Sequence, residues 1–210
     1  MNSIKKLLSL GGSSLNVGDP KIGDLSDIYG EEAKVLESLL QIKNGFYAFE
    51  SALHLLSSRA CEADIGLDIW NSAGLWKGEY QGLADGFLFF AEDIFGLQFG
   101  ISKDGISQFD PETGAATVIA GDLDGWACAL LRDYDFLTGY SIAHSWQMAN
   151  GPLAPGLRLV PKVPFVAGGK YELDNLYSLE AVKSMKLRAD LAVRIRDLPD
   201  GATIRYKPGD

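Results

Sequence analysis

The sequence has few of the residues on which metal sites, disulfide frameworks and nucleophilic active sites depend. It contains two cysteines, Cys61 and Cys128, with no Cys-x-x-Cys pair, and two histidines, His54 and His144. Two cysteines cannot build a disulfide scaffold, and the spacing typical of a zinc site is missing. We therefore expect no metal ion and no cofactor.

Long apolar runs are missing as well. The longest, such as residues 87–91, have the length of a strand, and the apolar run near the N-terminus soon meets Gly11-Gly12-Ser13-Ser14. A membrane-spanning helix needs about 20 apolar residues, and a signal peptide needs an apolar stretch of about 7–15. These features predict a cytoplasmic protein without a membrane partner.

The motifs of common catalytic machinery are absent too. The sequence has no Gly-x-Ser-x-Gly nucleophile elbow, and its paired glycines lack the spacing of a phosphate-binding loop. The segment Asp122-Leu123-Asp124-Gly125 is similar to the start of a calcium loop, but it lacks the further oxygen ligands and the closing glutamate. We expect no catalytic residues and no enzyme activity, and a hydrolase with a dispersed active site stays as an alternative.

Acidic residues, by contrast, are abundant and unevenly distributed. The net charge is −9; residues 1–150 hold 9 basic and 21 acidic side chains, and residues 151–210 hold 10 basic and 7 acidic ones. An acidic protein repels phosphate backbones, so we do not expect nucleic acid as a partner. An acidic surface attracts a basic protein and accelerates their encounter.

The hydrophobic pattern changes along the chain from helical spacing to strand-like alternation and back. Helices are expected over residues 31–42, 46–56, 126–134, 136–149 and 179–198, with a short helical turn within 64–70. Strands are expected over 87–90, 95–101, 106–110, 116–120 and 202–206. The pattern predicts an α+β protein in which an antiparallel sheet packs against helices. Residues 1–150 form the expected main domain, and residues 151–210 form a helix-containing C-terminal extension packed on it.

Candidate partner-binding residues come from the acidic turns and from two tryptophans. Carboxylates in turns usually stay solvated, which favours a surface role over acid–base chemistry, and an aspartate before the helix at Trp126 can also cap it. A tryptophan in a segment of weak periodicity is usually part of the core, but tryptophan is also a common interface anchor. The candidates are Glu92, Asp93, Asp110, Asp122, Asp124, Trp70 and Trp76.

Three stretches, in this order, resemble one known superfamily. Residues 43–54 (KNGFYAFESALH) come first, residues 89–99 (FFAEDIFGLQF) follow, and residues 108–114 (QFDPETG) lead to the helix at Trp126. The succession of strand, acidic turn, Phe-Gly, strand, hairpin and closing helix is similar to that of the SUKH superfamily. This superfamily is related to yeast regulators of cell-wall assembly and killer-toxin resistance. The resemblance covers a little under half of the chain.

The resemblance implies a single α+β domain and a function in binding. Bacterial members of the superfamily are commonly immunity proteins that bind and neutralise a cognate toxin, often a nuclease. Nuclease toxins are often basic, which fits an acidic surface. The alternative is a regulatory scaffold with a housekeeping partner, as the yeast relatives suggest. The identity of the toxin, the role of residues 151–210 and the oligomeric state stay open at this point.

Overall fold

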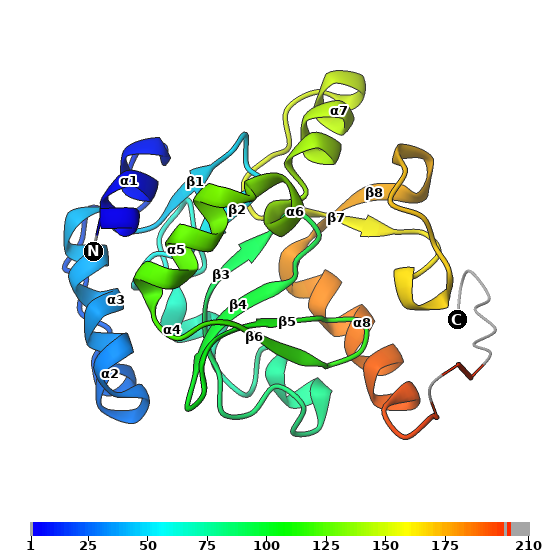
Figure 1. Cartoon of the computed structure of the whole chain (residues 1–210), viewed down its shortest axis with the longest axis horizontal. Coiled ribbons are helices and arrows are strands. Elements are labelled where there is room, and N and C mark those ends of the chain that lie inside the picture. Colours follow the sequence, from blue (N-terminus) through cyan, green and yellow to red (C-terminus); the bar gives the residue numbers. More distant parts are fainter. Residues whose placement is uncertain (1, 200, 203–210) are drawn as a thin grey trace.

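The structure is a computed structural model that describes residues 2–199 and 201–202. A six-stranded antiparallel sheet lies at its centre, and the strands follow one another in chain order (Figure 1). The strands are β1 (Phe46–Ala48), β2 (Leu53–Leu55), β3 (Leu88–Asp93), β4 (Gln98–Ser102), β5 (Gly105–Phe109) and β6 (Ala116–Ala120). The expected α+β class with an antiparallel sheet and helices is confirmed.

Both faces of the middle of the sheet are covered, which explains why β3 is buried along its whole length. On one face, Trp126 of α5 (Leu123–Arg132) packs edge-on against Phe90 and Phe99. On the other face, Trp76 packs against Phe89. Because successive side chains of a strand point to opposite faces, the neighbouring Phe89 and Phe90 can pack against the layers on the two faces of the sheet.

The helix expected over residues 46–56 is wrong, because this segment forms the β1–β2 hairpin. Phe46 lies opposite Leu55 and Ala48 lies opposite Leu53, so the apolar spacing that fits a helix is also the alternation of two short strands. The turn between the strands, 49–51, contains no glycine or proline. The usual sequence signal of a hairpin turn is therefore missing.

The other helices agree with the expected pattern, with a few additions. They are α1 (Asn2–Leu10), α2 (Asp24–Tyr29), α3 (Glu31–Ile42), α4 (Leu67–Trp70), α6 (Tyr134–Thr138), α7 (Tyr140–Asn150) and α8 (Ala181–Ile195), with 3-10 turns η1 (Lys77–Tyr80), η2 (Phe165–Ala167) and η3 (Leu173–Asn175). The helix expected over 136–149 is interrupted at Gly139, whose φ of 69° is left-handed. The strand expected over 202–206 lies, apart from residue 202, outside the described residues.

The C-terminal segment contributes a second, two-stranded sheet and the last described helix. Strands β7 (Leu157–Pro161) and β8 (Leu176–Glu180) pair antiparallel, and the N–H of Leu159 donates to the carbonyl of Ile94 just after β3. The buried apolar residues of α8 belong to the main core: Ala181, Met185, Ala189 and Ala192. In Figure 1, β7, β8 and α7 lie on the side of the molecule away from α1 and α3.

Candidate functional site

A cluster of buried charged side chains lies where the C-terminal segment meets the sheet. His54 comes from β2, Glu92 from β3, Asp64 from the loop after β2, and Arg158 from β7. Arg158 and Glu92 are each 1% exposed and His54 is 3% exposed. Charged side chains are almost never buried to this degree unless they are paired.

The pairing begins on the sheet itself. His54 and Glu92 are direct cross-strand partners, and His54 Nδ1 lies 3.1 Å from Glu92 Oε1. Arg158 Nε lies 2.9 Å from the same oxygen, and Gln98 Nε2 donates to Glu92 Oε2 at 3.2 Å. Both carboxylate oxygens of Glu92 are therefore in contact with a donor.

The other side of the histidine faces Asp64. His54 Nε2 lies 3.3 Å from Asp64 Oδ1. This distance is short enough for an ion pair, although the geometry of the two groups does not form a hydrogen bond. Asp64 is held in place by Ser57, whose backbone N–H donates to its carboxylate. The imidazole therefore lies between two carboxylates.

These contacts shift the pKa values of all three titratable groups. Burial disfavours the charged form of Glu92, but the Arg158 guanidinium and then His54 lower its pKa to about 2. Burial also disfavours a charged His54, yet Asp64 and Glu92 outweigh this effect and raise its pKa. Burial opposes the ionisation of Asp64 as well, but His54 lowers its pKa overall. The two carboxylates of Asp64 and Glu92 are thus offset by two basic side chains, Arg158 and His54, and their contacts favour the cationic form of the histidine.

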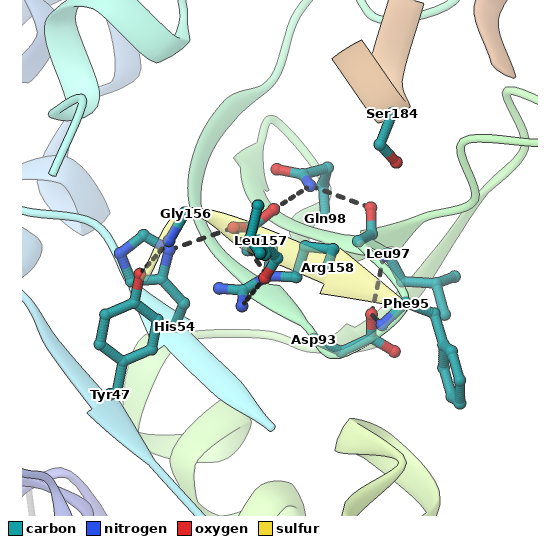
Figure 2. A network of polar contacts seen from close by, with 12 residues as sticks. Tyr47, His54, Asp93, Phe95, Leu97, Gln98, Gly156, Leu157, Arg158 and Ser184 are labelled. Carbon is teal, nitrogen blue, oxygen red and sulfur yellow. Dashed lines mark hydrogen bonds and ion pairs between the residues drawn. The ribbon is translucent and has the colours of Figure 1, made fainter. Parts of the chain in front are cut away.

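Aromatic and amide side chains hold the cluster in position, as Figure 2 shows. Tyr47 stacks on His54 with ring centroids 4.3 Å apart, and its hydroxyl accepts a hydrogen bond from the N–H of Gly156 at 3.0 Å. Trp70 Nε1 donates to Gln98 Oε1 at 2.8 Å, which orients the amide that contacts Glu92. Arg158 also donates to the carbonyl of Leu157. The charged groups are fixed by neighbours from both parts of the chain.

A small cavity of about 60 Å³ lies beside this cluster. Its lining includes His54, Asp64, Glu92 and the buried Trp70. A volume of this size suits about two water molecules, whereas pockets for organic ligands measure about 300–1,000 Å³. The cavity has room for water next to the imidazole.

A second group of buried charges lies near α8. Asp93 Oδ1 accepts hydrogen bonds from the N–H groups of Phe95 and Leu97, and burial raises the pKa of Asp93 well above its usual value. Arg188 donates to the carbonyl of Phe95 at 2.6 Å. Glu112 accepts from the N–H of Val166 at 2.9 Å, and burial raises its pKa to about 6. These contacts also fasten the C-terminal segment to the sheet.

Four of the residues expected to bind a partner are not accessible. Glu92 and Asp93 are buried rather than solvated, because β3 continues through Asp93 and the sheet is covered on both faces there. Trp70 and Trp76 are also buried, with ring centroids 5.5 Å apart in the core. The interpretation of these four side chains as exposed contact residues is wrong.

The remaining three candidates are at least partly accessible, and each has a local structural role. Asp122 is exposed and accepts from the N–H of Gly125, which caps α5. Asp124 accepts from the N–H groups of Ser3 and Ile4 at the start of α1. Asp110 accepts from the N–H of Glu112 in the turn after β5. Binding of a partner by Asp110, Asp122 and Asp124 stays a prediction.

Sequence reasoning missed His54, Asp64, Arg158 and Arg188 as members of buried clusters. The available signal was the charge difference between the two parts of the chain. Two of the basic side chains of the C-terminal segment, Arg158 and Arg188, are buried against the acidic body.

Within residues 2–199 and 201–202, His, Cys, Asp and Glu side chains do not form a group of three or more that could hold a metal ion. No helix in the described part of the chain has the length and apolar character to span a bilayer.

Comparison with known proteins adds information on the fold alone. No protein-family model and no curated protein matches the chain. Among solved structures, the crystal structure of Atu4351 from Agrobacterium tumefaciens is similar, with a TM-score of 0.54 and 13% sequence identity. The similarity covers 88% of this chain and 87% of that one, so it reaches beyond residues 1–150 into the C-terminal segment.

Proposed function

We propose that this chain is a cytoplasmic immunity protein of the SUKH type, which binds and neutralises a cognate toxin. The observation that carries the proposal is the internal pairing of the buried cluster. His54, Asp64, Glu92 and Arg158 balance one another's charge, and the cavity beside them has room for about two water molecules. The cluster therefore joins two parts of the chain, which favours a structural role for these side chains.

The accessible surface supports a basic partner. Exposed carboxylates outnumber exposed lysines and arginines within residues 1–150, even without the buried Glu92, Asp93 and Glu112. Asp104 and Asp122 are exposed members of this set. A negative potential of this kind accelerates association with a positively charged toxin.

Co-expression with the product of a neighbouring toxin-like reading frame tests the proposal. The expected result is that the chain restores growth and co-elutes with that product as a stable complex. A toxin from an unrelated pair is the control, and the chain should not neutralise it. Failure to restore growth, together with no complex between the purified proteins, would overturn the proposal.

A further inference from the structure

Aromatic side chains gather on the surface formed by the β1–β2 turn, α6 and α7. Phe49 stacks on Tyr134 with centroids 5.0 Å apart, Tyr134 meets Tyr140 edge-on at 5.3 Å, and Tyr140 stacks on His144 at 6.0 Å. Phe136, two residues after Tyr134, is 82% exposed. We call the four residues in ring contact, Phe49, Tyr134, Tyr140 and His144, the aromatic surface, and Phe136 is its exposed neighbour on α6.

One face of α7 extends this surface. Tyr140, His144 and Met148 are spaced four residues apart, so they lie on the same side of the helix. The Met148 side chain is 76% exposed. Single exposed apolar residues need no explanation, but a run of stacked rings with two nearly free apolar side chains is typical of a binding surface.

The backbone that carries Phe49 is strained. Phe49, Glu50 and Ser51 have φ values of 52°, 51° and 69°, so three successive residues with side chains adopt the left-handed conformation. Each such residue is unfavourable, and strain of this kind persists where the surrounding structure enforces it, most often at functional sites.

Contacts with α7 enforce this conformation. His144 Nδ1 lies 2.7 Å from Glu50 Oε2, and the Tyr140 hydroxyl donates to Glu50 Oε1 at 3.2 Å. Gln147 Nε2 donates to the backbone carbonyl of Glu50 at 2.8 Å. The side chains of Glu50 and His144 are about half exposed, so their ion pair adds little to stability. Their geometric effect is to fix the ring of Phe49 and the carboxylate of Glu50 beside α7.

The segments that form this surface contain acidic side chains and no lysine or arginine. Residues 44–58 and 133–157 contain no lysine or arginine, whereas Glu50, Asp133 and Asp135 are acidic and exposed. Asp133 and Asp135 flank Tyr134 in the sequence and stand at the start of α6. The aromatic surface is therefore bordered by carboxylates, which is complementary to a cationic partner.

We propose that the aromatic surface is where the toxin docks, through arginine side chains of a basic patch. Arginine combines a planar cation that stacks on tyrosine rings with donors that match carboxylates, so Tyr134, Tyr140, Glu50 and Asp135 together suit it better than lysine. The proposal rests on the immunity function proposed above and names the surface that would perform it. Phe136 and Met148 act as apolar anchors beside these contacts.

Binding to the purified, catalytically inactivated product of the neighbouring toxin-like reading frame provides the test. Phe136→Ala should weaken the complex by about tenfold or more, because the exposed ring contributes to the interface and not to the core. Asp135→Asn keeps an oxygen that can accept from Ser141, as Asp135 does now, and should lower the association rate at low salt. Circular dichroism and thermal melting verify that both variants stay folded.

Matched controls lie on other faces of the molecule. Ile42→Ala removes an apolar side chain that is 68% exposed at the end of α3, and Glu79→Gln neutralises an exposed carboxylate at η1. Both should bind the toxin like the wild type. If the wild type forms the complex and Phe136→Ala and Asp135→Asn bind equally well, the docking surface is wrong while the immunity function stands.

Two further outcomes would also overturn the assignment. If the wild type does not bind the toxin, the immunity function fails and the docking surface fails with it. If light scattering shows a wild-type dimer that Phe136→Ala converts to a monomer, a second copy of the chain occupies the surface instead.

Discussion

Arg158 on β7 and Glu92 on β3 form an ion pair in which Nε lies 2.9 Å from Oε1 and both side chains are buried. The pair joins the C-terminal segment to a central strand of the sheet. Removing one partner leaves the other charge buried without compensation, so Arg158→Met should lower the free energy of unfolding by about 3–5 kcal/mol. Urea denaturation followed by tryptophan fluorescence measures this loss.

Arg194→Met is the matched control for this prediction. Arg194 Nε lies 2.9 Å from Asp190, but both side chains are exposed on α8, and such pairs contribute about 0–1 kcal/mol. The double variant Glu92→Gln, Arg158→Met removes both buried charges and should recover part of the loss. Equal losses in the two single arginine variants would contradict a role for the buried pair.

The low pKa of Glu92 predicts a loss of stability in acid. The folded protein holds the pKa of Glu92 near 2 against an ordinary value of 4.5, so the stabilisation is present above pH 4.5 and is lost as the pH falls toward 2. The difference in unfolding free energy between the wild type and Glu92→Gln should therefore shrink over this range. Urea denaturation at a series of pH values measures it, and a difference that stays constant down to pH 2 would exclude the shift.

The pKa of Glu112 is shifted the other way and predicts the opposite dependence. Burial raises it from 4.5 to about 6, so the folded protein binds this proton more tightly than the unfolded chain. The contribution of this group to the free energy of unfolding therefore falls as the pH rises from 4.5 to about 6. Above pH 6, the free energy of unfolding of Glu112→Gln should be higher than that of the wild type by up to about 2 kcal/mol. The glutamine oxygen can still accept from Val166, and thermal melting across this pH range measures the gain.

Trp126 is expected to be the costliest single truncation on its face of the sheet. Its fully buried ring meets Phe90 and Phe99 edge-on with centroids 4.8 and 5.7 Å away. Trp126→Ala should lower the free energy of unfolding by about 3–5 kcal/mol through the cavity it leaves. Phe136→Ala removes an exposed ring and should cost less than about 0.5 kcal/mol in the same denaturant titration. Similar losses for both would mean that Trp126 does not close the core.

The meander from β3 to β6 could be predicted because its signals are local. A continuous apolar run marks β3, alternating apolar residues mark β4 and β5, and Asp104-Gly105 and Gly114 mark the turns after β4 and β5. The β1–β2 hairpin could not be predicted in the same way. Its turn is built from Phe49, Glu50 and Ser51, whose left-handed backbone is held by α7, far away in the sequence.

The candidate site was missed because its evidence is tertiary. In the sequence, Glu92 and Asp64 look like ordinary surface carboxylates, and burial is rare for such residues. Only the fold brings His54 between them and Arg158 against Glu92. The aromatic surface was missed for a related reason, since Phe49 and Tyr140 come from segments that the periodicity assigned to two separate helices.

The position of Arg158 also affects how the protein emerges from the ribosome. Glu92 and Asp93 are synthesised well before Arg158 and Arg188, and domains tend to fold as units during synthesis. A nascent chain that ends before β7 can pair the strands of the meander, but it holds the Glu92 carboxylate next to apolar side chains without its arginine. The buried ion pair at the central sheet is therefore completed only after β7 has been synthesised, and chains that end before β7 are expected to be less stable.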